Sequence, residues 1–131
     1  MLLDTHVLLW WIAGDTRLSK RLRTAIAENG PALVSPITFW EIGTLSERGR
    51  IAIDRDLNQW VRDVCALDDI EIAPLTPGAA MSAARLTEFH ADPADRLIYA
   101  TARELRVPLA SKDRMLRSYA RRHGEVRVIW Y

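Results

Sequence analysis

The 131-residue sequence has a single cysteine, Cys65, and no long apolar run, repeat, low-complexity tract or linker. One cysteine excludes an internal disulfide and favours a reducing, cytoplasmic setting. The longest apolar run, Val7–Ala13, is far shorter than the roughly 20 residues of a membrane-spanning helix, so we expect no membrane partner. Asp4 precedes any basic residue, which speaks against a secretory signal. We expect residues 1–131 to form one domain.

The charges are unevenly distributed. The sequence is 49% hydrophobic and 27% charged, as in ordinary globular proteins, with a net charge of +1. Residues 103–127 carry eight Lys or Arg and three Asp or Glu, a net +5, whereas residues 1–102 carry ten and fourteen, a net −4. This asymmetry indicates an anionic partner for the C-terminal segment, although basic stretches are more often simply solvated surface.

Short apolar runs alternate with longer segments of helical periodicity. Alternation of this kind predicts right-handed crossovers between parallel strands, with helices on both faces of the sheet. We therefore predict an α/β fold, a three-layer α/β/α sandwich around a mainly parallel sheet of four to five strands. The expected strands are Met1–Asp4, Ala32–Ser35, Ile70–Pro74, Pro108–Ser111 and Val126–Trp130. The expected helices are Thr5–Ala13, Ser19–Glu28, Ile37–Ser46, Asp56–Leu67, Pro77–Phe89, Pro93–Leu105 and Asp113–Arg121.

Glu41 is the one charged residue in an otherwise apolar or neutral stretch, Ile37–Leu45. In a helix it shares a face with the residues four before and four after it, and we expect that face to point into the protein. Glu41 lies too deep in the helix to act as a cap. The only local cation is Arg48, seven residues on. Because an unpaired buried charge is costly, Glu41 needs a compensating cation.

Three aspartates fall where predicted strands end and helices begin. Asp4 ends the first strand, Asp113 follows the fourth, and Asp95 lies in the first turn of the helix begun by Pro93. Taken singly, each is explained more simply as a helix cap or as a charge near a helix N-terminus. Asp92 is likewise the expected N-cap of the helix at Pro93.

Considered together, these acids predict a metal site. The carboxyl ends of parallel strands share one edge of the sheet, so Asp4, Glu41, Asp95 and Asp113 should meet there. Carboxylates brought together repel one another and raise one another's pKa values unless a cation is bound. All-oxygen ligands favour Mg²⁺ or Mn²⁺ over zinc. The three histidines show no ligand spacing, and we interpret them as ordinary polar residues: His6, His90 and His123.

Four sequence blocks resemble the PIN-domain ribonucleases, and among these the VapC-type toxins of bacterial toxin–antitoxin pairs. The blocks occur in the family's order and near its spacing across the whole chain, which makes the ordered set specific. They are Leu2–Trp11, Ser35-Pro36 with Trp40-Glu41-Ile42, His90–Ile98 and Leu109–Asp113.

The resemblance implies a metal-dependent endoribonuclease that uses Mg²⁺ or Mn²⁺ and leaves 5′-phosphate and 3′-hydroxyl ends. The family's acidic cluster falls on Asp4, Glu41, Asp95 and Asp113. Asp4 and Asp95 are the expected direct ligands. Glu41 would hold or deprotonate the attacking water, and Asp113 would complete the shell or support a second ion.

Further implications concern the surroundings of the site and the partners. Thr5 matches a small polar residue that helps hold the site, and His6 stands where many members have a smaller residue. Whether one or two ions bind, and whether Asp92 joins the site, stays open. The resemblance also implies an RNA substrate, a VapB-like antitoxin and a homodimer.

Basic residues near the expected site are candidates for RNA contacts. Arg96, Lys112 and Arg114 are close enough in sequence to the acids to meet phosphates. Arg114, Arg117 and Arg121 recur at three- and four-residue steps and form one basic helix face. That face would follow an RNA backbone, but a solubilising surface explains it equally well.

The five tryptophans are expected to be core or interface anchors rather than platforms for base stacking. Adjacent Trp10 and Trp11 cannot face the same way on a helix, so one should pack inward. The other is a candidate to line a groove for an antitoxin peptide or a dimer contact. The remaining three are Trp40, Trp60 and Trp130.

Three alternatives stand beside the toxin hypothesis. The first is a PIN-domain RNA-processing nuclease without an antitoxin, and the second is a non-catalytic PIN-like binding module. The third is a phosphate-receiving signalling domain, which needs an acceptor aspartate after its third strand. Here that stretch, Ile70–Leu75, contains no aspartate. The sequence does not indicate which RNA is cleaved.

Overall fold

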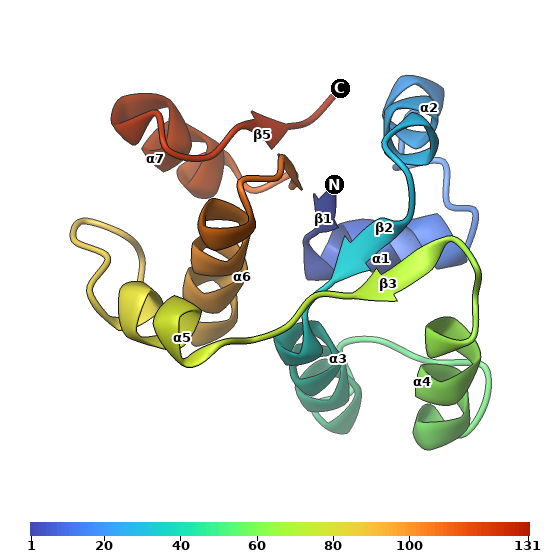
Figure 1. Cartoon of the computed structure of the whole chain (residues 1–131). Helices are drawn as coiled ribbons and strands as arrows, with labels where there is room; N and C mark the ends of the chain where they lie inside the picture. Colours follow the sequence, from blue (N-terminus) through green and yellow to red (C-terminus); the bar gives the residue numbers. More distant parts are fainter.

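The computed structural model describes all residues, 1–131, and contains a five-stranded sheet between two groups of helices (Figure 1). The strand order is β3-β2-β1-β4-β5, and every neighbouring pair is parallel. The predicted parallel α/β sheet is therefore confirmed, with five strands. They are short: β1 Leu2–Leu3, β2 Ala32–Val34, β3 Ile70–Ile72, β4 Leu109–Ala110 and β5 Val128–Ile129.

All seven predicted helices are present. Each begins after an Asp, Ser or Thr whose side chain accepts a hydrogen bond from the first turn, so local capping fixes where the helices start. None of them has the length and apolar character needed to cross a membrane. They are α1 Thr5–Ile12, α2 Lys20–Glu28, α3 Pro36–Glu47, α4 Leu57–Cys65, α5 Pro77–Ala84, α6 Pro93–Leu105 and α7 Arg114–His123.

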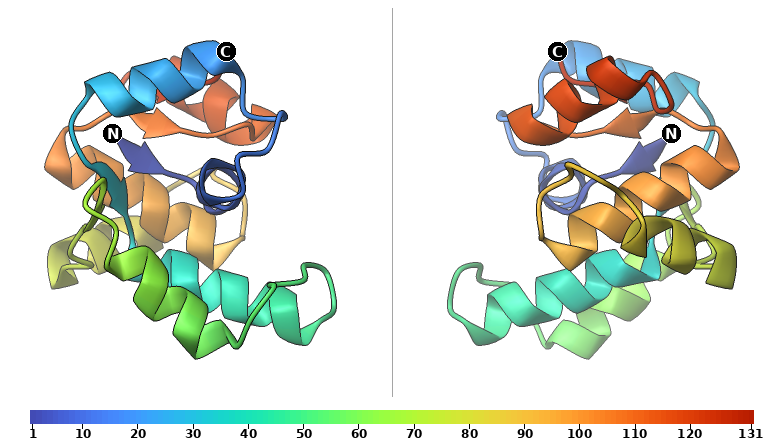
Figure 2. Two further views of the ribbon diagram at one scale, coloured as in Figure 1. Left: turned by 90° about the vertical axis from the view of Figure 1, so that its right-hand side faces the viewer. Right: turned by 90° about the vertical axis from the view of Figure 1, so that its left-hand side faces the viewer.

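Alternating strand side chains build two separate cores, one on each face of the sheet. Leu3, Val34 and Ala110 pack with side chains of α1 to α4, while Leu2 and Leu109 pack with side chains of α6 and α7. This is the two-faced burial expected of a parallel sheet. Figures 1 and 2 show α5, α6 and α7 lying on the opposite side of the sheet from α1, α2 and α4. The predicted three-layer α/β/α arrangement is confirmed.

Helix α3 links the two halves of the molecule. It follows the central part of the sheet and contacts both α1 on one side and α6 on the other. Its residue Ile42 belongs to the core on the α1 side, whereas Ile37 packs against the core on the α6 side. Glu41, which lies between these contacts, lines the pocket in which the other predicted acids lie.

Helix α5 ends at Ala84, so the prediction of a helix running to Phe89 is wrong. The cause is Arg96 on α6, whose guanidinium donates hydrogen bonds of 2.8 to 3.4 Å to five backbone carbonyls. These bonds hold the chain in a loop, and Glu88 adopts a left-handed φ of 58° within it. The five acceptors are the carbonyl oxygens of Ala83, Ala84, Leu86, Phe89 and His90.

The same contacts correct the expectation that Arg96 meets an RNA phosphate. A guanidinium has five N–H donors, and here each is engaged by a carbonyl of the loop. No donor is left for a phosphate. Arg96 therefore has a structural role, which is to hold the segment between α5 and α6 in place.

Replacing Arg96 with Met should lower the free energy of unfolding by about 2 kcal/mol, because loop carbonyls lose a charged donor while the aliphatic stem is largely kept. Urea denaturation followed by circular dichroism measures this change. Arg121→Met, at an exposed position, is the matched control and should change stability little. Equal stability of the two variants would contradict the structural role of Arg96.

Candidate active site

Two adjacent strands bring residues from opposite ends of the chain together. Asp4 follows β1, Ser111 follows β4, and the two strands are parallel neighbours. The Ser111 hydroxyl donates a 2.6 Å hydrogen bond to Oδ2 of Asp4. The backbone N–H of Thr5 donates to Asp4 Oδ1 at 2.8 Å. Asp4 is thus buried and fixed at the carboxyl edge of the sheet, where ligands of open α/β sheets bind.

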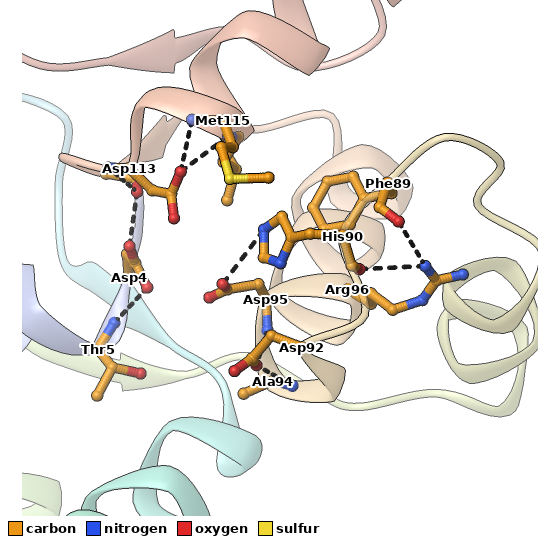
Figure 3. A network of polar contacts seen from close by, with 12 residues as sticks. Asp4, Thr5, Phe89, His90, Asp92, Ala94, Asp95, Arg96, Asp113 and Met115 are labelled. Atoms are coloured by element: carbon orange, nitrogen blue, oxygen red, sulfur yellow. Dashed lines mark hydrogen bonds and ion pairs between the residues drawn. The ribbon is translucent and has the colours of Figure 1, made fainter.

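One pocket at this edge contains all four predicted acids. Asp4 comes from the end of β1, Glu41 from α3, Asp95 from α6 and Asp113 from the start of α7. Asp92, whose participation the sequence left open, also lines it. Figure 3 shows the carboxyl groups of Asp4, Asp95 and Asp113 pointing toward a common space. The rest of the lining is His6, Leu45, Lys112, Arg114 and Met115.

Helix capping and a place in the pocket are not alternatives for these acids. Asp113 caps α7 through Oδ1, which accepts from the N–H groups of Met115 at 2.7 Å and Leu116 at 3.0 Å. Asp92 caps α6 in the same way, with Oδ1 alone. In both residues Oδ2 accepts no hydrogen bond from the protein. A carboxylate can therefore begin a helix with one oxygen and offer the other to a ligand.

Glu41 lies differently from the expectation. Its helix buries Thr38 and Ile42, whereas Ile37, Glu41 and Leu45 are only half-buried. Of the predicted inward-facing stripe, Ile37 packs against the core on the α6 side, whereas Glu41 and Leu45 line the acidic pocket. Glu41 lies on a face that is shielded from solvent but polar, which is why a charged residue is accommodated there.

The crowding of the acids disturbs their ionisation. Burial, followed by the nearby charges of Asp4, Asp92, Glu41 and Asp113, raises the pKa of Asp95 to about 8. Burial likewise raises the pKa of Asp4, against the lowering effect of its hydrogen bonds with Ser111 and Thr5. The pKa of Glu41 is also raised, mainly by burial. Without a cation, the pocket does not hold all its carboxylates ionised near neutral pH.

The donor atoms fit a divalent cation. Oxygens of Glu41, Asp92 and Asp95 lie within 4.8 Å of one another. The hydroxyl of Thr5 is fully buried next to Asp4 and interacts with the side chain of Glu41, which lowers the pKa of that carboxyl. The oxygen-rich set suits Mg²⁺ or Mn²⁺.

The comparisons with known proteins agree with this geometry. The PIN domain description matches residues 1–122. The chain belongs to the PIN-domain family. It is 37% identical over 131 residues to ribonuclease VapC22 of Mycobacterium tuberculosis, covering 99% of this chain and 98% of that protein. The family resemblance of the four sequence blocks is thereby confirmed.

Two solved structures share the fold of this PIN domain. One is a toxin–antitoxin complex from Klebsiella pneumoniae, with a TM-score of 0.63 and 21% identity over 98% of this chain and 95% of that one. The other is VapBC2 from Rickettsia felis bound to a DNA fragment from its promoter, with a TM-score of 0.68 and 16% identity over 98% and 96%. At these identities the likeness concerns the fold.

The sequence did not reveal that His90 of this PIN domain lies next to two of the acids, Asp95 and Asp113. Its Nε2 lies 3.4 Å from Oδ2 of Asp95, and its ring nitrogen is within 4.8 Å of carboxylate oxygens of Asp95 and Asp113. No short metal-ligand spacing marks it. One feature of the sequence could have indicated its place. His90 lies two residues before the N-cap Asp92, and residues before a cap pass close to the first turn of the helix that follows.

The basic residues of the PIN domain divide into two groups. Lys112 and Arg114 line the pocket beside the acids, and Arg121 is exposed further along α7. Arg117 instead donates to the carbonyls of Lys112 and Asp113, both at 3.3 Å, and so ties the start of α7 together. Arg114 and Arg121 are therefore available to an anion, Arg117 is partly engaged, and the Lys112 ammonium group lies 4.6 Å from the ring centroid of Trp10.

The raised pKa of Asp95 predicts a pH-dependent stability of the metal-free protein. Between the usual carboxyl value of 3.8 and about 8, the folded state keeps a proton that the unfolded chain releases. The free energy of unfolding should therefore fall as the pH rises through this window. Asp95→Asn should make the fall smaller, and an added divalent cation should restore stability at the upper end.

Thermal melts with a chelator at about pH 5 and about pH 8 measure this effect. Asp68→Asn, at an exposed position outside the pocket, is the matched control and should follow the wild type. If the Asp95→Asn variant loses as much stability with rising pH as the wild type, the pKa of Asp95 is not raised in the folded protein.

Proposed function

We propose that this PIN domain is a metal-dependent endoribonuclease and the toxin of a toxin–antitoxin pair. The observation that carries the proposal is the gathering of Asp4, Glu41, Asp95 and Asp113 in one pocket at the carboxyl edge of the sheet. The identity of 37% to a protein named as a ribonuclease supports RNA as the substrate class. An RNA-processing nuclease without an antitoxin is the second candidate, since it would need the same pocket.

The proposed cofactor is Mg²⁺ or Mn²⁺, held among the carboxylates of Asp4, Glu41, Asp95 and Asp113, with Asp92 offering a further oxygen. When bound, the cation supplies positive charge that lowers the pKa of a water molecule and offsets charge developing on the phosphate. The protein's contribution is to hold the carboxylates in place before the ion arrives. Ser111 and the N–H of Thr5 do this for Asp4, and the N–H groups of α7 do it for Asp113.

Glu41 is the proposed general base. Its raised pKa brings the carboxylate closer to the value suited to accepting a proton from water near neutral pH. The water oxygen forms a bond to phosphorus, the bond between phosphorus and the 3′ oxygen breaks, and the departing oxygen takes up a proton. The products carry 5′-phosphate and 3′-hydroxyl ends. Lys112 and Arg114 at the rim would hold the phosphate.

Glu41→Gln should lower the rate of RNA cleavage by about a hundredfold or more, because the amide cannot accept the proton. Single-turnover cleavage of end-labelled RNA at saturating metal measures the rate, and circular dichroism checks the fold. Glu47→Gln, in the same helix but exposed and outside the pocket, should cleave at the wild-type rate. Wild-type cleavage by Glu41→Gln would remove the proposed base.

The exposed arginines of α7 extend the proposed RNA path beyond the pocket. If Arg114 and Arg121 each neutralise one phosphate, removing both should reduce the slope of log affinity against log salt by about 1.4, at roughly 0.7 per contact on a single strand. Filter binding to an uncleaved RNA analogue measures the slope. Arg62→Ala with Arg48→Ala, both exposed and outside α7, is the control. An unchanged slope would identify the α7 face as solvated surface.

The proposed protein partners are a VapB-like antitoxin and a second copy of this chain. Trp10 packs into the core, as expected for one of the adjacent pair, while Trp11 is half-buried and lines a cleft between α1 and α4 with Trp60 and Leu67. Such a cleft suits an apolar peptide side chain. We expect the complex in the cytoplasm, where RNA is present and Cys65 stays reduced.

The neighbouring reading frame distinguishes the toxin from a processing nuclease. Induced expression of this chain should arrest growth, and co-expression of a short adjacent frame should relieve the arrest and yield a complex that purifies intact. Sequencing of RNA 5′ ends after brief induction, against an Asp4→Asn control, would identify the substrate. Cleavage without growth arrest, or an arrest that the neighbour does not relieve, would favour the processing nuclease.

A further inference from the structure

His90 has a polar side chain near the acids but no role in the proposed reaction. Its side chain is 18% exposed, but the Nε2 atom has no contact with solvent and no hydrogen-bond partner in the protein. The nearest charged atom, Oδ2 of Asp95, is 3.4 Å away. A buried ring nitrogen without a partner is unusual, because nearly all such atoms are satisfied in folded proteins. Something bound at the site should complete it.

The protein fixes the imidazole ring from the side opposite to the acids. The buried Phe89 stacks on it with a centroid distance of 4.6 Å and an interplanar angle of 22°. Arg96 donates 3.2 Å hydrogen bonds to the carbonyl oxygens of both Phe89 and His90. Figure 3 shows the ring between Arg96 on one side and Asp95 on the other. His90 is therefore held in place facing the acidic pocket, before any ligand binds.

The geometry defines a second set of donor atoms beside the all-oxygen one. A ring nitrogen of His90 and carboxylate oxygens of Asp95 and Asp113 lie within 4.8 Å of one another, as do oxygens of Glu41, Asp92 and Asp95. Asp95 belongs to both sets. Oδ2 of Asp113 accepts no hydrogen bond because the cap of α7 uses Oδ1 only. The second set thus has donor atoms with spare capacity on each residue.

We propose that His90 is a direct nitrogen ligand of a divalent cation bound with Asp95 and Asp113, next to an all-oxygen position that shares Asp95. Neutral imidazole is a common metal ligand. Mg²⁺ strongly prefers oxygen ligands, whereas Mn²⁺ also accepts imidazole, so this position should select Mn²⁺ over Mg²⁺. The inference rests on the proposed function only in that a cation enters the pocket.

The test is pulsed electron paramagnetic resonance of Mn²⁺ bound to the whole chain in the absence of RNA. A directly bound histidine nitrogen gives a characteristic coupling to the Mn²⁺ electron spin, and labelling the protein with ¹⁵N-histidine changes it in a known way. We expect the coupling in the wild type, its loss in His90→Gln, and its retention in His6→Gln. His6 lines the acidic pocket but belongs to neither donor set, which makes it the matched control.

Calorimetric titration provides a second readout that does not depend on catalysis. His90→Gln should weaken Mn²⁺ binding by at least about tenfold and Mg²⁺ binding less, which narrows the preference between the two ions. Circular dichroism checks that the variant is folded. Bound Mn²⁺ without nitrogen coupling in the wild type would overturn the assignment, as would a coupling that persists in His90→Gln.

These outcomes are distinguishable from a failure of the proposed function. If the protein cleaves RNA and binds Mn²⁺ without nitrogen coupling, the proposed nuclease function stands and the proposed role of His90 is refuted. If the protein shows the coupling but cleaves no RNA, the proposed role of His90 stands and the proposed nuclease function is refuted.

Discussion

Mutual repulsion among carboxylates at one edge of the sheet is the constraint around which the rest of the molecule is arranged. Asp4, Glu41, Asp92, Asp95 and Asp113 come from separate segments and are pressed into one pocket. Repulsion of this kind opposes folding, and it is tolerated because several of the acids are also held by local groups. Three of the acids cap helices, and one accepts a hydroxyl from the neighbouring strand. The stability of the scaffold is what keeps the charges close enough to attract a cation.

The scaffold derives little of its strength from the sheet itself. Strands of two or three residues form few ladder hydrogen bonds, so the two hydrophobic cores that they separate must hold the layers together. The strands serve mainly to set register. β1 lies in the middle of the order, between β2 and β4, and this places Asp4 beside Ser111 and near the start of α3. β3 lies at the edge of the sheet, so it does not carry the acceptor site that a phosphate-receiving domain has after its third strand.

Local signals in the sequence were sufficient for much of the fold. The helix Pro93–Leu105 begins and ends where predicted, because Asp92-Pro93 is a strong start signal whose effect is confined to a few residues. The gathering of the acids followed from the parallel topology. The end of α5 was missed because Arg96, more than ten residues away from Ala84 in the sequence, captures the carbonyls that would continue the helix.

The misjudged parts of the site have a similar origin. The periodicity placed Glu41 on an apolar stripe correctly, but it does not distinguish a core from a shielded polar pocket, and only the contact of α3 with α6 decides that. His90 has no ligand spacing, and its orientation is set by stacking on Phe89 and by the anchoring of the loop. Contacts between distant segments therefore determined what the local sequence left undecided.

Three aspartates both cap a helix and line the pocket, and this restricts which substitutions the pocket can accept in evolution. Asp4, Asp92 and Asp113 each start a helix with a side-chain oxygen. Asn caps a helix about as well as Asp, whereas Ala in that position costs about 1 kcal/mol. A homologue that loses metal binding but stays folded can therefore accept few substitutions at these positions. The main one is Asp to Asn, which replaces a carboxylate oxygen with an amide nitrogen. Descendants that have lost their chemistry should carry asparagines at these positions.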